Sequence, residues 1–228
     1  MRLDKYICKS TDLSRLEASD ALQSRQVKVD NKVFSNSALQ IHKNNAVTLD
    51  DTLLTLRSFR YILVHKPANT LCSNVDEIYP SILNYIDVDK KSELHVVGRL
   101  DADTTGLVLI TDDGSWTYKI ITPNAQCEKV YRVTLRNDIT EGAILQLEKG
   151  LMLQGIDEPT LPAKVTVLSP NEVLLTITQG KFHQVKRMFR AVGNRVRGLH
   201  REKIGQVSLD VELGQWRYLT NDEINSFY

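Results

Sequence analysis

The sequence predicts an α+β protein, with a small domain over residues 1–58 and a larger domain over residues 59–228 built around a mixed, largely antiparallel sheet. Three observations lead to this prediction. The first fifty or so residues carry a helix pattern and a hairpin pattern of their own. From Arg60 onward, strand-like and helix-like segments alternate without a clear repeat. A chain of 228 residues with 42% hydrophobic residues is also long and apolar enough to build a sizeable core.

The small domain begins with two strong local signals. Ser14-Arg15-Leu16-Glu17 fits a capping box, which predicts a helix from Arg15 to about Ser24. Val27 and Val29 then alternate with polar residues up to the pair Asp30-Asn31, and Val33 and Phe34 follow. Asp and Asn tolerate the left-handed backbone of a two-residue turn, so this pattern predicts a β-hairpin.

The remaining elements follow from apolar periodicity and from turn residues. Lys66-Pro67 ends one strand, Pro123 follows a short helix, and Gly150 ends a longer one. Asp50-Asp51 is expected to open a polar connection, and Thr220-Asn221-Asp222-Glu223 is a second capping box. The predicted strands are 46–49, 61–64, 94–97, 107–111, 130–135 and the hairpin pair 165–168 and 173–178, and the predicted helices are 116–121, 140–149 and a short terminal one.

A further helix is expected to begin near Phe182. Apolar residues recur there at helical spacing, so one stripe should be buried while the neighbouring cations lie on its flanks. Gly193 is expected to end the helix. The stripe consists of Phe182, Val185, Met188, Phe189 and Val192.

Composition excludes several classes of protein. The N-terminus lacks the apolar segment of a signal peptide, and no stretch approaches the ~18 apolar residues needed to cross a bilayer, so we expect a cytoplasmic protein without membrane contact. Cys8, Cys72 and Cys127 are odd in number and widely spaced, which predicts neither a disulfide framework nor a zinc site. We expect all three to be reduced.

The formal net charge is only +1, but the cations are concentrated in one segment. Between Lys181 and Lys203 eight cations stand against the single acid Glu202. A local field of this kind favours a surface that faces a polyanion, whatever the total charge. The eight are Lys181, Lys186, Arg187, Arg190, Arg195, Arg197, Arg201 and Lys203.

The most informative segment is Gly98-Arg99-Leu100-Asp101-Ala102-Asp103-Thr104-Thr105-Gly106-Leu107. It sets a carboxylate between a basic residue and a polar turn, directly before the apolar strand that ends at Thr111. Without further information, a surface Asp that caps a turn is an equally good interpretation. The segment, however, closely resembles the active-site motif of pseudouridine synthases of the ribosomal small-subunit synthase A type. That resemblance implies that Asp101 is the catalytic residue.

Two later segments resemble motifs of the same family, so the resemblance covers essentially the whole chain. Glu128-Lys129-Val130-Tyr131 implies that Tyr131 stacks on the target base, although by itself it also fits a tyrosine that packs between strands. Gln184-Val185-Lys186-Arg187-Met188-Phe189 implies that Lys186 pairs with Asp101. An opposite charge would keep a partly desolvated carboxylate ionised. His183 and His200 could contact phosphate or simply pack.

The resemblance also implies the reaction. The glycosidic bond of a uridine breaks, the uracil turns, and the ribose is rejoined through C5, with no metal or cofactor required. Asp101 would attack the sugar or the base or assist an elimination, and the sequence does not choose. The base must first leave its stack, after which Arg99 and the 181–203 cations, Arg187 among them, would hold the displaced RNA backbone.

The order of motifs in residues 1–58 resembles the S4-type RNA-binding module that this family commonly carries. By that resemblance the RNA face would consist of Arg2, Lys5, Arg15, Arg25 and Lys28. Two features depart from the module: Arg25-Gln26 replaces a glycine before the first hairpin strand, and Asp30-Asn31 replaces Asn-Gly in the turn. A small protein-interaction domain is the alternative.

Three alternative functions remain open at this point. Asp101, Asp103, Asp112 and Asp113 could bind divalent metal for phosphoryl transfer, but a strand of about seven residues would hold the two pairs roughly 20 Å apart. A non-catalytic RNA-binding protein of ribosome assembly would tolerate Asp101→Asn. A synthase acting on large-subunit ribosomal RNA is the third. We expect a monomeric enzyme that modifies one uridine of 16S rRNA, alone or within an assembling small subunit.

Overall fold

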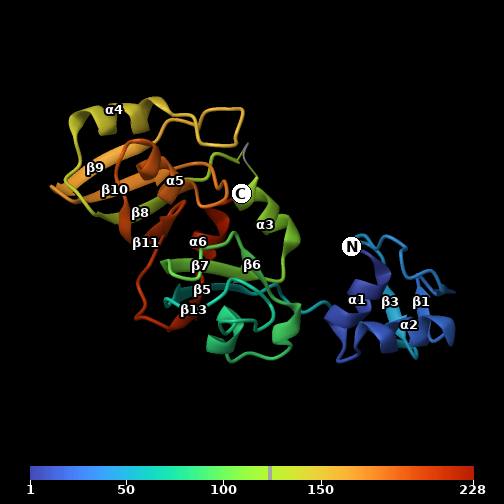
Figure 1. The fold of residues 1–228 in the computed structure, drawn as a ribbon. Helices are drawn as coiled ribbons and strands as arrows, with labels where there is room; N and C mark the ends of the chain where they lie inside the picture. Colours follow the sequence, from blue (N-terminus) through green and yellow to red (C-terminus); the bar gives the residue numbers. More distant parts are fainter. Residues whose placement is uncertain (123–124) are drawn as a thin grey trace. The chain divides into compact units, whose positions relative to one another are not determined.

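The computed structural model describes residues 1–122 and 125–228, so Pro123, which follows one predicted helix, lies outside the described residues. The chain divides into two compact units, Met1–Ser58 and Phe59–Tyr228 (Figure 1). This division falls at the boundary expected from the sequence. Each unit has its own helices, its own sheet and its own hydrophobic core, so each is described by itself.

The N-terminal unit is a four-stranded antiparallel sheet packed against two helices. Its strands follow the order β2-β1-β3-β4. Leu3 and Ile7 of the first helix and Leu22 of the second are fully buried, and Val27 and Val47 of the sheet complete the same core. The elements are α1 (Leu3–Ser10), α2 (Arg15–Gln23), β1 (Val27–Val29), β2 (Lys32–Val33), β3 (Val47–Leu49) and β4 (Thr52–Leu53).

The local signals of this unit are confirmed, with one correction. The Ser14–Glu17 capping box starts α2, and Asp30 and Asn31 both have positive φ in the β1–β2 turn. Asp50-Asp51 does not open a polar connection. Both residues have positive φ, of 47° and 61°, and they form a second tight turn, so β3 pairs with β4. Two consecutive left-handed residues suit a two-residue hairpin even without glycine.

The larger unit is built on a nine-stranded sheet. The main path of strands is β13-β5-β7-β11-β8-β10-β9, while β6 pairs with β7 and β12 with β11. Every pairing is antiparallel except β7 with β11, so the predicted mixed, largely antiparallel sheet is confirmed. The strands are β5 (Tyr61–Lys66), β6 (His95–Val97), β7 (Thr105–Thr111), β8 (Lys129–Leu135), β9 (Lys164–Ser169), β10 (Glu172–Ile177), β11 (Val196–Ile204), β12 (Val207–Ser208) and β13 (Trp216–Tyr218).

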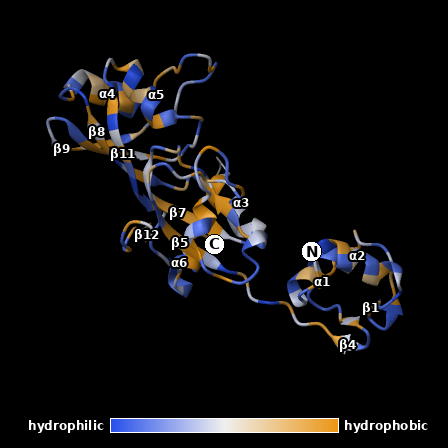
Figure 2. Cartoon of the chain, turned by 60° about the horizontal axis from the view of Figure 1, so that its bottom comes forward, coloured by the Kyte–Doolittle hydropathy of each residue, from blue (hydrophilic) through white to orange (hydrophobic). Residues whose placement is uncertain are grey.

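Both faces of the central strands are covered. In β7, Leu107 and Leu109 pack with Trp116 on one face, whereas Val108 and Ile110 belong to the cluster on the other face. Figure 2 shows β5 and β7 as hydrophobic strands. The covering elements are the helices α3 (Gly114–Ile121), α4 (Glu141–Lys149), α5 (Gln184–Ala191) and α6 (Asn221–Asn225), with short 3₁₀ turns at Ile82–Tyr85 and Lys91–Glu93.

Two predictions for the larger unit need correction. Phe182 is not part of a buried helical stripe. The helix begins only at Gln184, and Phe182 lies before it with 75% of its surface exposed. The basic segment up to Lys203 is also more than a charged surface, because Val196–Ile204 forms β11, a central strand of the sheet. The predicted helix over 140–149 is confirmed as α4, and the predicted capping box at Thr220 starts α6.

Candidate active site

The loop that carries Asp101 is held from beneath by a buried ammonium group. Lys66, at the end of β5, is fully buried, and its Nζ donates to the carbonyl oxygens of Pro67, Ala102 and Thr104 at 3.0, 3.1 and 2.8 Å. All three donors of the ammonium are therefore used by backbone. Burial lowers the pKa of Lys66. Two of the three acceptors lie within three residues after Asp101, so this lysine fixes the loop to the sheet.

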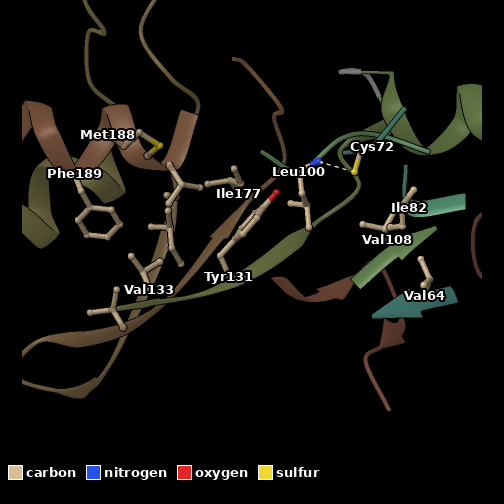
Figure 3. Packing of buried hydrophobic residues seen from close by; sticks show 14 of the residues in the cluster. Val64, Cys72, Ile82, Leu100, Val108, Tyr131, Val133, Ile177, Met188 and Phe189 are labelled. Atoms are coloured by element: carbon tan, nitrogen blue, oxygen red, sulfur yellow. Dashed lines mark hydrogen bonds between the residues drawn. The ribbon is translucent and has the colours of Figure 1, made fainter. Parts of the chain in front are cut away.

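Further backbone contacts complete the loop. The amide of Thr104 donates to the carbonyl of Asp101 at 3.1 Å, which closes a tight turn. The amide of Leu100 donates to Sγ of the buried Cys72 at 3.4 Å (Figure 3). Strand β7 begins at Thr105 immediately afterwards. The position of Asp101 is therefore set by the backbone on both sides, while its side chain keeps 26% of its surface exposed.

Lys186, in the first turns of α5, is the counter-charge of Asp101. Its Nζ lies 2.8 Å from Oδ2 of Asp101 and 2.6 Å from Oδ1 of Asp103. Burial alone would lower the pKa of Lys186, but the hydrogen bonds to the two carboxylates outweigh it and raise the pKa above its ordinary value. The same contacts outweigh burial in Asp103 and lower its pKa. At neutral pH the ammonium therefore stays charged.

Helix α5 is rigidly placed. Met188 and Phe189 are fully buried beneath it. Gln184, only 4% exposed, accepts from the Lys181 amide at 2.9 Å and donates to Oε1 of Gln179 at 3.3 Å. Lys186 thus approaches Asp101 from a helix that is anchored both in the core and at its first turn.

Tyr131 forms another wall of the same pocket. It lies in β8, where it pairs with Leu175 of β10 and with Arg201 of β11, and it is 8% exposed. Figure 3 shows its ring between Ile177 and Leu100. One pocket is lined by Arg99, Leu100, Asp101, Thr104, Tyr131, Ile177, Gly180, Lys181, His183, Gln184, Val185, Lys186 and Leu199. The three residues predicted to act in catalysis therefore meet in one place.

An aromatic wall, a carboxylate and its counter-charge in one pocket can hold a flat ring beside an anionic nucleophile. Comparisons with known proteins agree with this arrangement. The family model described as RNA pseudouridylate synthase matches residues 60–191. A relative from Vibrio cholerae, named ribosomal small subunit pseudouridine synthase A, is 46% identical over the full length of both chains.

The chain belongs to the RNA pseudouridylate synthase family. A similarly named relative from Haemophilus influenzae is 44% identical over 98% of each chain. A crystal structure described as a pseudouridylate synthase superposes with a TM-score of 0.74 at 42% identity and covers all of both chains. The similarity therefore spans both units of this synthase.

The alternative of a metal cluster is not supported by the geometry. Asp112 accepts from the amide and side chain of Arg60, and Asp113 caps α3 and accepts from the hydroxyl of Tyr61. In residues 1–122 and 125–228, no three His, Cys, Asp or Glu side chains are grouped so that they could hold a metal ion. No helix in this described part of the chain is long and apolar enough to span a membrane.

Arg201 is the residue that the sequence did not single out. It was counted among the surface cations, but it is only 3% exposed. Its Nε donates to the carbonyl of Leu107 at 2.8 Å, and its Nη1 donates to the hydroxyl of Tyr131 at 3.4 Å. Arg201 lies opposite Tyr131 in the sheet. The sequence could not show this pairing, because residues 196–204 were not expected to form a strand. Arg201 thus supports the tyrosine from behind rather than facing RNA.

The other predicted RNA contacts lie in two places. Arg99 is exposed at the pocket, and the partly exposed Arg187 donates to the carbonyl oxygens of Phe182 and Gln154. In the N-terminal unit, Lys5 and Arg25 are exposed and Lys28 pairs with Asp51. Arg2 and Arg15 both bind Asp4, at 2.8 and 3.3 Å, and share one groove with it.

Proposed function

We propose that this synthase isomerises one specific uridine of small-subunit (16S) ribosomal RNA to pseudouridine. The observation that carries the proposal is the contact of Asp101 with Lys186 in a pocket walled by Tyr131. The names of the relatives from Vibrio cholerae and Haemophilus influenzae support the choice of small-subunit RNA, because the similarity extends over nearly the whole length of each. We also propose that the protein is a monomer. Its location is proposed to be the cytoplasm, where its RNA substrate is made.

Each of the three residues has a distinct role in the proposed reaction. The carboxylate of Asp101 acts on the nucleoside while the N1–C1′ bond breaks and the C5–C1′ bond forms. C5 loses its proton and N1 gains one, so the reaction is an isomerisation without a change of redox state. Lys186 places a positive charge against this carboxylate, and Tyr131 supplies a flat surface on which the uracil can be held while it turns.

The RNA is proposed to reach the pocket by a flipped nucleotide, because the reactive atoms of a stacked base are inaccessible. A groove of about 570 Å³ adjoins the catalytic pair and is lined by Asp103, Lys186, Arg190, Asn194, Arg195 and Val196. Arg190 and Arg195 are exposed there and suit backbone phosphates. Arg99 lines the catalytic pocket, and Arg187 contacts the segment that precedes α5. The S4-like unit adds a second RNA contact, formed by Arg2, Lys5, Arg15, Arg25 and Lys28.

The test is to incubate the protein with unmodified 16S rRNA and with 23S rRNA, as naked RNA and as assembling subunits. Carbodiimide treatment followed by reverse transcription then maps pseudouridine as stops. We expect one new stop in 16S rRNA and none in 23S rRNA. A stop only in 23S rRNA would overturn the choice of substrate, and the absence of any stop on every RNA would overturn the enzymatic function.

A further inference from the structure

An exposed aromatic pair lies at the edge of the pocket, on the segment that precedes α5. The ring centroids of Phe182 and His183 are 3.7 Å apart and their planes differ by 21°, so the two rings are stacked. Phe182 is 75% exposed, and the His183 side chain 42%. Burial of a phenylalanine ring is favourable, so most such rings are covered in folded proteins. A ring held face-on in this way is therefore a candidate binding surface.

His183 of this pair contacts Asp101 directly. Nε2 of His183 lies 3.3 Å from Oδ1 of Asp101, and His183 lines the same pocket. The Phe182 ring lies against the His183 ring, with the two centroids 3.7 Å apart. Phe182 is thus connected to Asp101 through the single side chain of His183.

The backbone holds the pair in place. His183 has φ of 49°, a left-handed conformation that is uncommon for a residue with a side chain. The carbonyl of Phe182 accepts from Nη1 of Arg187 at 3.3 Å, and the Lys181 amide donates to the buried Gln184. The segment is therefore anchored on both sides of the two rings, which favours a preformed surface over a loose loop.

The charges around the pair point to RNA as the occupant. Lys181 and Arg187 flank it in the sequence, and Lys186 lies at the pocket beside it. A protein partner would not require cations on both sides, whereas a nucleotide presents a flat base together with a phosphate. When a uridine leaves its stack, the neighbouring base also loses a stacking partner, and a protein aromatic ring can replace it.

We propose that Phe182, backed by His183, is a stacking subsite for a nucleobase next to the uridine that enters the pocket. This inference rests on the proposed function and adds a specific contact to it. Phe182 binds the neighbouring base through its exposed face and has no part in the bond exchange. It therefore contributes to affinity for RNA and to the choice of site, and the rate of the chemical step does not depend on it.

The experiment uses the full chain and a 16S rRNA fragment that contains the modified uridine. Two further fragments carry an abasic residue on one or the other side of that uridine. Phe182→Ala is compared with Phe182→Trp, which keeps a stacking surface, and with Leu145→Ala, which removes a side chain of similar exposure (67%) from α4. Dissociation constants and single-turnover rates are measured for each protein with each RNA, and melting temperatures check folding.

We expect Phe182→Ala to weaken binding roughly 5- to 150-fold, because a base stacked on an aromatic ring contributes about 1–3 kcal/mol. Its single-turnover rate at saturating RNA should stay within about threefold of wild type. Phe182→Trp and Leu145→Ala should bind as wild type does. On one of the two abasic fragments the difference between wild type and Phe182→Ala should disappear, which identifies the stacked neighbour.

The proposal is overturned if Phe182→Ala binds the intact fragment as tightly as wild type, or if its loss persists undiminished on both abasic fragments. It is also overturned if Phe182→Trp binds as weakly as Phe182→Ala. Failure of the proposed function is a different result, because the wild-type protein would then form no pseudouridine in any RNA. If the wild-type protein forms pseudouridine but Phe182→Ala has no effect on binding, only the stacking subsite is disproved.

Discussion

The two units of this synthase each contain a cluster of three charged residues, with the charges reversed. In the N-terminal unit one carboxylate, Asp4, lies between the guanidinium groups of Arg2 and Arg15. In the larger unit one ammonium, Lys186, lies between the carboxylates of Asp101 and Asp103. In both clusters the central charged group contacts two groups of opposite charge. The outer groups are cations in the first cluster and carboxylates in the second.

The exposure of each group separates the two clusters. The side chain of Asp4 is 5% exposed, whereas those of Arg2 and Arg15 are 46% and 76% exposed. In the larger unit Lys186 and Asp101 are similarly covered, at 28% and 26%, while Asp103 is 69% exposed. The first cluster therefore holds cations outward from a buried anchor, as a phosphate-binding surface requires. The second sets an ammonium group against a partly covered carboxylate at the pocket, so it turns a carboxylate, and not a cation, toward a bound molecule.

The sharpest way to break this comparison is to neutralise one acid at a time in the second cluster. Asp101→Asn should lower the single-turnover rate by ~10³-fold or more, because it removes the carboxylate proposed to act on the nucleoside, while RNA affinity stays near that of wild type. Asp103→Asn removes the other carboxylate that contacts Lys186 and should change the rate by less than about tenfold. Carbodiimide mapping and filter binding measure the two quantities. Equal losses for the two variants would contradict the assignment of Asp101.

Removing the central cation should have the next largest effect. Lys186→Met leaves the Asp101 carboxylate without its closest counter-charge, and breaking a charge-assisted contact costs about 1.5–3 kcal/mol, which corresponds to roughly 10- to 150-fold in rate. Lys186→Arg retains the positive charge and should recover part of the rate. Because the pKa of Lys186 is raised, its charge persists through neutral and mildly alkaline pH, so no activity should be lost there through this residue. A Lys186→Met enzyme with wild-type activity would contradict the pairing role.

In the first cluster, the outward cations should affect binding and not chemistry. Arg2→Ala combined with Arg15→Ala should weaken RNA binding severalfold and lower the salt dependence of the binding constant by about 0.7 for each lost phosphate contact. The rate at saturating RNA should not change. Lys149→Ala, which removes an exposed cation at the end of α4, serves as the control. An unchanged salt dependence in the double variant would remove Arg2 and Arg15 from the RNA face.

The smallest effect is expected at the buried anchor. Burial alone would raise the pKa of Asp4, but hydrogen bonds from Arg2, the Lys5 amide and Arg15 lower it below the ordinary value of 3.8. Its contribution to stability is therefore present above that value and is lost as the pH falls through the lowered pKa. Asp4→Asn should cost about 1 kcal/mol at neutral pH and remove this acid-dependent loss. Hydrogen exchange of α1 from pH 3 to pH 7 measures the loss of stability and its pH dependence. Identical exchange profiles for wild type and Asp4→Asn would contradict a stabilising role of the Asp4 carboxylate.

Local signals allowed much of the fold to be predicted from the sequence. Capping boxes at Ser14 and Thr220 fixed the starts of two helices, because the side chain and backbone satisfy one another within four residues. By contrast α1 has Arg2 at its N-cap, without a side-chain hydrogen bond there, so nothing in the sequence marked its start. β4 was missed because the two aspartates before it replace the usual glycine turn.

The candidate site was predictable only where motifs carried it. Asp101, Tyr131 and Lys186 were expected together, and the structure places them around one pocket. Arg201 and Phe182 were misjudged for the same physical reason: burial depends on which strand or helix lies opposite, and sequence periodicity does not contain that. β11 is rich in cations and partly exposed along most of its length, so its pattern does not resemble that of a buried central strand.

The parallel pairing of β7 with β11 has a consequence for how the molecule forms. Gly106 lies so close to Arg201 in this pairing that a Cβ at position 106 would come within 2.3 Å of the Arg201 carbonyl oxygen. The hydroxyl of Thr105 and the ring of His200 meet across the same seam, 95 positions apart along the polypeptide. Such long-range pairing raises contact order and slows folding. During translation Asp101 therefore leaves the ribosome well before Lys186 and Arg201, and the pocket can form only after these later residues have been synthesised.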